Sequence, residues 1–105
     1  RGEGSEELGR TLMKTCWVCM LEADVKPSKI YFINSSVKMV VNDSVHLENI
    51  KKLADLGVEI AACGICLDFY GLIEELGVGS ITNMYAITDS ILGDNILKLY
   101  LSLTL

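Results

Sequence analysis

The chain has 105 residues, of which 50% are hydrophobic and 22% charged, and its formal net charge is −5. This length gives one domain, residues 1–105, with a single core, and the scattered basic residues of an acidic chain argue against nucleic acid as a partner. No apolar run reaches the ~18 residues of a membrane span and the polar start lacks a signal-peptide pattern, so we expect cytoplasmic location, no membrane contact and reduced cysteines.

The amino-terminal part predicts a long helix from Ser5 to about Ala23. Ser5 is expected to cap it, and the two glutamates that follow favour the positive end of the helix dipole. The face expected to point inward holds Leu8, Leu12, Cys16, Cys19 and Ala23. Apolar residues, Trp17 among them, extend so far around this helix that it should pack on both sides, as core or as a subunit interface.

The middle of the chain predicts a strand and a second helix. Residues 29–34 are β-branched and aromatic, which is typical of a strand, and they end in a polar turn from Asn34 to Ser36. Residues 37–41 are ambiguous, and we expect a loop or a short strand-like piece that covers the site. A helix over about residues 45–56 should follow, ended by Gly57 in a left-handed conformation.

The next segment contains the motif Cys63-Gly64-Ile65-Cys66. Residues 58–62 predict a short buried strand, which puts Cys63 at its carboxyl end and Cys66 at or near the start of a helix closed by Gly77. A short extended link over residues 78–81 should then carry a few strand residues.

The last part predicts a helix and a strand. Thr82 or Asn83 is expected to cap a helix from Met84 to about Leu92, which Gly93 stops. Residues 96–105 alternate leucine with other residues, and this period of two predicts a strand. Alternating helices and strands indicate an α/β protein, a three-layer α/β/α sandwich with a mainly parallel sheet. Because such units normally begin with a strand, we expect the first strand upstream of Arg1.

The two thiols of the Cys63–Cys66 motif are the candidate catalytic groups. The positive end of a helix dipole lowers the pKa of a cysteine, and the thiolate attacks sulfur or binds metal. Open α/β sheets react at the carboxyl ends of their strands, which is where the motif is expected. The alternative is that both thiols are small buried core residues, as free cysteines most often are.

Other residues have weaker functional signals. The candidate binding residues are Asn34, Gly64, Asp68 and Asn83. Asn34 is a candidate donor to an anionic sulfur, Asp68 is a candidate for orienting a partner or water, and Asn83 is otherwise a helix cap. His46 is expected at the surface, and Cys16 and Cys19 are expected to be core thiols.

Several strings in the chain resemble a known family. They are residues 1–9, 12–14, 32–34, 37–38, 57–60, 63–72 and 82–85, including CGICLDFYGL and TNMY. They are similar to the DsrE/DsrF-like sulfur-relay family, and within it to the carboxyl-terminal domain of YedF-like proteins, predicted sulfurtransferases linked with selenium metabolism. Where that subgroup tends to have glycine after the asparagine that ends the strand, this chain has Ser35 and Ser36.

The resemblance implies a five-stranded parallel sheet, homo-oligomers, and a strand before Arg1. It also implies a cysteine that carries persulfide sulfur between donor and acceptor proteins, with a TusA-like carrier as partner. The family's reactive cysteine falls on Cys63, and Cys66 matches the second cysteine of the subgroup. The chain is therefore expected to be a sulfur-relay protein or sulfurtransferase that needs no metal or cofactor.

Three other functions are compatible with the sequence. Cys16 and Cys19 together with Cys63 and Cys66 would form a four-thiolate zinc site, although the gap between the pairs is far longer than in known zinc motifs. A CxxC motif also suits a thioredoxin-like thiol–disulfide oxidoreductase, although the order of elements differs. The third is a non-catalytic subunit of a sulfur-relay complex.

Overall fold

The computed structural model of the protein describes residues 2–93. It has a mixed α/β fold around a three-stranded, wholly parallel sheet in the order β1-β2-β3. The strands are β1 (Lys29–Phe32), β2 (Glu59–Cys63) and β3 (Ser80–Thr82). The predicted α/β class and parallel pairing are confirmed, whereas the strand predicted over residues 96–105 lies outside the described residues.

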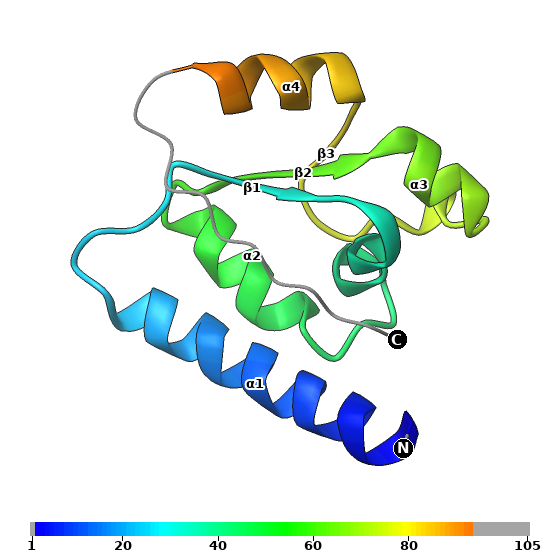
Figure 1. Ribbon diagram of the computed structural model, residues 1–105. Helices are drawn as coiled ribbons and strands as arrows, with labels where there is room; N and C mark the ends of the chain where they lie inside the picture. Colours follow the sequence, from blue (N-terminus) through cyan, green and yellow to red (C-terminus); the bar gives the residue numbers. More distant parts are fainter. Residues whose placement is uncertain (1, 94–105) are drawn as a thin grey trace.

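The middle strand, β2, is buried on both faces. Its residues Ile60, Ala61, Ala62 and Cys63 are each between 1% and 3% exposed. Figure 1 shows why, because α2 (Leu47–Asp55) lies under the sheet and α4 (Met84–Leu92) lies over its opposite face. A strand covered on both faces needs a continuous apolar run, which residues 60–63 supply, while the charged Glu59 at its start is exposed.

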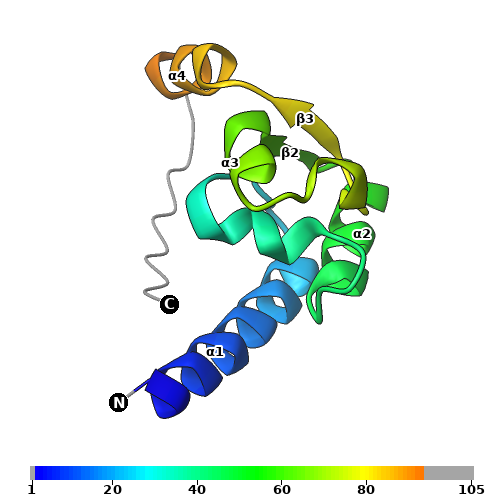
Figure 2. The ribbon, with the colours of Figure 1, turned by 90° about the vertical axis from the view of Figure 1, so that its right-hand side faces the viewer.

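The first helix, α1 (Gly2–Glu22), packs on the outer side of α2 (Figure 2). Its contact face differs from the predicted one. Met13 and Trp17 are each 2% exposed, whereas Leu8 and Leu12 are more than half exposed. Because little of the helix is polar after Lys14, periodicity alone did not identify the face that meets α2.

The turn after α2 and the turn after the helix that carries Cys66 both depend on a glycine with positive φ. After α2, Gly57 has φ of 100°, its N–H donates to the Ala54 carbonyl, and the next N–H, of Val58, donates to Leu53. This pair of bonds is the Schellman motif, which needs a left-handed residue that glycine adopts without strain. Leu53 and Val58 are both buried, which agrees with the hydrophobic contact that often accompanies this motif.

The helix that carries Cys66 is shorter than predicted. It is α3 (Gly64–Phe69), and Gly71, with φ of 69°, ends it by a second Schellman turn. The 3-10 helix η2 (Ile73–Glu75) follows. Apolar spacing predicted that this helix would continue as far as Gly77. Leu72 and Leu76, two of the apolar residues beyond its observed end, still pack against the core.

Residues 37–41 also differ from the prediction of a loop or strand. They belong mostly to η1 (Asn34–Val40), a 3-10 helix whose residues Val37 and Val40 are fully buried. Only Val41 has strand character, in an isolated antiparallel bridge to Leu76. The apolar residues of this segment therefore belong to the hydrophobic core. Because they are buried on more than one side, the sequence shows neither the period of a strand nor that of a helix.

Candidate functional site

The CxxC motif lies at the carboxyl edge of the sheet, as predicted. Cys63 is the last residue of β2 and also the residue before α3, which begins at Gly64. Phe32, the last residue of β1, pairs with Ala62, so the loop after β1 reaches the same edge. Figure 1 shows η1 and α3 side by side there, and the two elements are in contact.

The loop after β1 contributes a hydrogen-bond donor to one of the thiols. The backbone N–H of Asn34 donates to Sγ of Cys66 at 3.1 Å. Asn34 has φ of 54°, a left-handed conformation that asparagine adopts more readily than most residues. The structure thus brings the two predicted residues together, but through the backbone of Asn34 and not through its side-chain amide.

The two thiols differ in exposure. Cys63 is only 1% exposed, whereas Cys66 is half-buried, and both are free. The Cys63 thiol lies close enough to the Cys66 thiol to affect its pKa. The burial of Cys63 argues against the expectation that it attacks a donor first, because a reagent in solution reaches Cys66 instead.

The pKa of Cys66 is raised, which corrects the expectation of a lowered value. Burial is the largest cause, the hydrogen bond with Cys63 is the next, and the Asn34 N–H opposes them. The charge that develops on Cys63 raises the pKa further. α3 has only six residues, so its dipole does not outweigh these effects. At neutral pH Cys66 is therefore mainly a thiol whose small thiolate fraction is highly nucleophilic.

The remaining candidate binding residues have structural roles or face elsewhere. A Cβ on Gly64 would lie 3.0 Å from Cγ2 of Ile81, so glycine lets α3 start close to β3. The side-chain oxygen of Asn83 accepts the Ala86 N–H at 2.9 Å and caps α4. Asp68 is exposed, and two residues along α3 correspond to about 200° of rotation from Cys66, so it does not face that thiol.

His46 was expected at the surface, but it is 5% exposed. It immediately precedes α2 and packs edge-on to Trp17, with ring centroids 6.4 Å apart. Burial, then the charges of Lys14 and Arg10, lower its pKa. The imidazole is therefore neutral in the fold and lies at the α1–α2 contact, where it packs on Trp17.

The thiols of α1 do not join those of the sheet edge. Cys16 is half-buried and Cys19 is exposed, so the expectation that both are core thiols is wrong for Cys19. Among residues 2–93, no group of three or more His, Cys, Asp or Glu side chains is arranged to hold a metal ion. The four-thiolate zinc alternative is thus not assembled.

Large apolar side chains are exposed on and near the helix that carries Cys66. The large apolar residues exposed on and near α3 and the start of α4 are Ile33, Ile65, Phe69, Ile81, Met84 and Tyr85. Phe69 and Tyr85 are more than four-fifths exposed. Apolar spacing in the sequence did not distinguish these exposed residues from core residues such as Leu67, which is fully buried.

Comparison of the chain with protein-family models, curated proteins and solved structures found no match. Within residues 2–93, none of the helices combines the length and the apolar character that crossing a bilayer requires.

Proposed function

We propose that this domain carries sulfane sulfur on Cys66 between a persulfide donor and an acceptor thiol. The observation that carries the proposal is the arrangement around that sulfur, where a backbone N–H at 3.1 Å faces a half-buried thiol. An N–H donor stabilises an anionic sulfur, whether it belongs to a thiolate or to a persulfide. The parallel sheet and the resemblance to the DsrE/DsrF-like family support the same proposal, with the three-layer sandwich of that family as the proposed complete architecture.

The transfer balances without an external oxidant. The Cys66 thiolate attacks the outer sulfur of a persulfide on the donor protein, the bond between the donor's two sulfurs breaks, and the donor leaves as a thiolate. Cys66 then holds the persulfide. An acceptor thiolate attacks the outer sulfur in turn, and the Cys66 thiolate is released.

Cys63 provides a second outcome from the same intermediate. Its thiolate attacks the inner sulfur of the Cys66 persulfide, hydrosulfide leaves, and the Cys63–Cys66 disulfide forms. A dithiol reductant must then regenerate the two thiols. Because Cys63 is 1% exposed, it reacts with Cys66 and not with a large partner directly. This order, with Cys66 first and Cys63 second, reverses the one that the family resemblance implies.

The partners are proposed to be proteins and not small molecules. Cys66 is half-buried on α3, and the same helix exposes the apolar side chains of Ile65 and Phe69. Such a surface suits protein contact. We propose a small carrier of the TusA type as donor or acceptor, further copies of this chain as neighbours, and the cytoplasm as the compartment.

A thiol–disulfide redox function is the second candidate. The observation that favours it is the CxxC spacing at the junction of β2 and α3, where the Cys63 thiol is close enough to Cys66 to raise its pKa. It differs from sulfur carriage in its product, because redox exchange yields a disulfide and adds no sulfur to the chain. A non-catalytic subunit would show neither product.

The test uses a chain with Cys16→Ser and Cys19→Ser, so that only the site thiols remain. This chain is reduced, incubated with a persulfide donor, and measured by intact mass. We expect a gain of one sulfur atom, which persists longer in Cys63→Ser and disappears in Cys66→Ser.

Each other outcome decides against part of the proposal. An adduct lost in Cys63→Ser but kept in Cys66→Ser would make Cys63 the carrier. Loss of two hydrogens with no sulfur gained at any time would favour redox exchange. No change in mass in any variant would leave a non-catalytic subunit as the function.

A further inference from the structure

The first helix carries a second thiol pair that the proposed sulfur site does not use. Cys16 and Cys19 are both free and stand three residues apart in α1. With about 3.6 residues per turn and ~1.5 Å of rise, their Cα atoms lie ~5 Å apart on one side of the helix. That separation falls within the range of about 4.4–6.8 Å found across disulfides.

The two thiols are unequal in access. Cys19 is exposed, whereas Cys16 is half-buried beside the α1–α2 contact. Burial raises the pKa of Cys16, and the nearby Cys19 raises it further. Cys19 is therefore the thiol that meets a reagent first, and Cys16 is the thiol placed to react with whatever Cys19 has bound.

Closing a disulfide here would distort the helix. Side chains three residues apart on a regular helix have Cβ atoms about 5–6 Å apart, whereas a disulfide holds them at about 3.5–4.5 Å. The turn from Cys16 to Cys19 must tighten to close this gap. A strained disulfide is more easily reduced than an unstrained one, so the bond would be reversible and would not act as a permanent crosslink.

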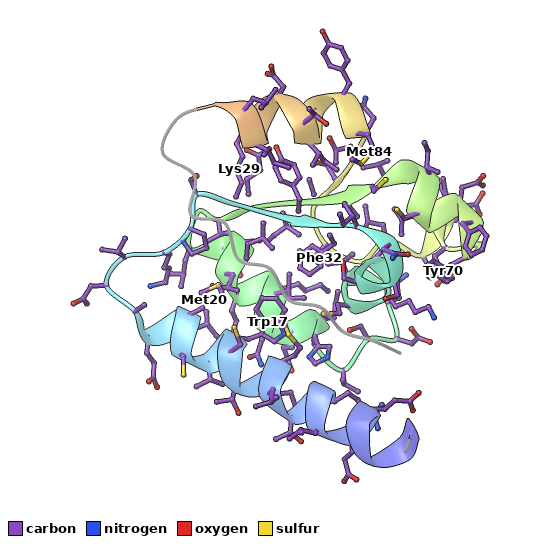
Figure 3. All side chains as sticks on the ribbon, viewed as in Figure 1. Trp17, Met20, Lys29, Phe32, Tyr70 and Met84 are labelled. Carbon is purple, nitrogen blue, oxygen red and sulfur yellow. The ribbon has the colours of Figure 1, made fainter. Side chains whose placement is uncertain are left out.

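Trp17 lies inside that turn and packs in the core. It is 2% exposed, and its ring centroid is 6.1 Å from that of Phe32 and 6.4 Å from that of His46. Figure 3 shows Trp17 and Met20 pointing from α1 toward α2. Tightening the turn from residue 16 to residue 19 must therefore move the side chain that holds α1 against α2.

We propose that Cys16 and Cys19 form a reversible redox site that reacts with low-molecular-weight disulfides and loosens α1 from α2 when oxidised. The Cys19 thiolate attacks the small disulfide, one small thiolate leaves, and a mixed disulfide forms on Cys19. The Cys16 thiolate then attacks the Cys19 sulfur and the second small thiolate leaves. Two protein thiols are oxidised by two electrons, the small disulfide is reduced to two thiols, and the protons pass to those thiols.

The experiment isolates this pair from the sulfur site. A chain with Cys63→Ala and Cys66→Ala is incubated with oxidised glutathione and measured by intact mass and by the emission of Trp17, the single tryptophan. We expect loss of two hydrogens, no lasting glutathione adduct, a red shift of the emission, and reversal by dithiothreitol. Cys16→Ser in the same background should stop at a stable glutathione adduct, and Cys19→Ser should react far more slowly.

Peptide mapping of the unsubstituted chain provides a check that needs no substitution. Cleavage after Lys14 and Lys29 leaves Cys16 and Cys19 on one peptide, apart from the peptide that carries Cys63 and Cys66. A lasting glutathione adduct on Cys19 while Cys16 is present would overturn the disulfide, and so would an absence of reaction. Disulfide formation with unchanged Trp17 emission would overturn the loosening of α1. None of these results depends on whether Cys66 carries sulfur.

Discussion

The backbone N–H of Asn34 reaches the sulfur of Cys66, 32 residues further along the chain, at 3.1 Å. The contact exists because β1 and β2 are parallel neighbours that end at the same edge of the sheet. The donor belongs to the backbone, so the identity of residue 34 matters mainly through the conformation that it allows. The left-handed φ of 54° at Asn34 turns the chain from β1 into η1 directly after this N–H.

Substitutions at position 34 should therefore separate backbone conformation from side-chain chemistry. Asn34→Gly keeps access to positive φ, and the alkylation rate of Cys66 at neutral pH should stay near that of the parent chain. Asn34→Val disfavours this conformation. Loss of a hydrogen bond to an anionic sulfur, about 1.5 kcal/mol, should lower the thiolate population and the rate about tenfold. Equal rates in both variants would show that the N–H does not stabilise the thiolate.

Removing the Cys63 thiol should lower the pKa of Cys66. Its hydrogen bond and its developing charge both raise that pKa, after burial, and Cys63→Ala abolishes both. The alkylation rate of Cys66 rises with pH as the thiolate forms, so the midpoint of this rise should move to lower pH in Cys63→Ala. Cys63→Ser keeps a hydrogen-bonding group but no ionisable thiol, and its midpoint should lie between the two. An unchanged midpoint in Cys63→Ala would contradict the coupling of the thiols.

Two glycines with positive φ should respond differently to alanine. At Gly57 an added Cβ meets nothing within 4 Å, so only the left-handed conformation is penalised. Gly57→Ala should then lower the free energy of unfolding by about 1–2 kcal/mol. At Gly79 the added Cβ would also overlap the carbonyl of Ile60, so Gly79→Ala should cost more than ~3 kcal/mol. Urea unfolding of both variants checks the difference, and equal losses would mean that β3 moves away from β2 without penalty.

The buried His46 should make stability fall in mild acid. Its pKa in the fold is below its ordinary value of 6.5, so the unfolded chain binds a proton first as pH falls. The free energy of unfolding should therefore decrease from about pH 7 to about pH 5, before the carboxylates titrate. The groups that act on the imidazole are Lys14 and Arg10 of α1, and both oppose its protonation. His46→Phe should lack this component, and a parallel decrease in both chains would contradict it.

Local signals in the sequence were sufficient to predict where several elements begin and end. The helix from Met84 to Leu92 has the predicted bounds because Asn83 is a side-chain cap and Gly93 follows its end. The junction of β2 and α3 also agrees with the prediction, because a short apolar run next to a glycine is typical of a buried strand that ends there. These features depend on residues close to each other in the chain, which is what a sequence pattern records.

What the sequence did not reveal depends on distant contacts. The buried face of α1 is chosen by α2, and the burial of His46 depends on Trp17. The pKa of Cys66 is set by burial and by Cys63, which together outweigh the helix dipole that the sequence alone indicates. The CxxC motif lies at the sheet edge where the sequence predicted it, but the more accessible of its two thiols was not identified, because exposure is a property of the packed chain.

No linker separates the strand from the helix at the site, since Cys63 ends β2 and α3 begins at Gly64. Inserting one residue between the cysteines would turn Cys66 by about 100° around α3 and carry it away from both Cys63 and the Asn34 N–H. The geometry of the site therefore requires the spacing of two residues between Cys63 and Cys66. In a lineage that keeps this chemistry, the motif should be inherited unchanged in length, and a chain that has gained or lost a residue there should also be free to lose both thiols.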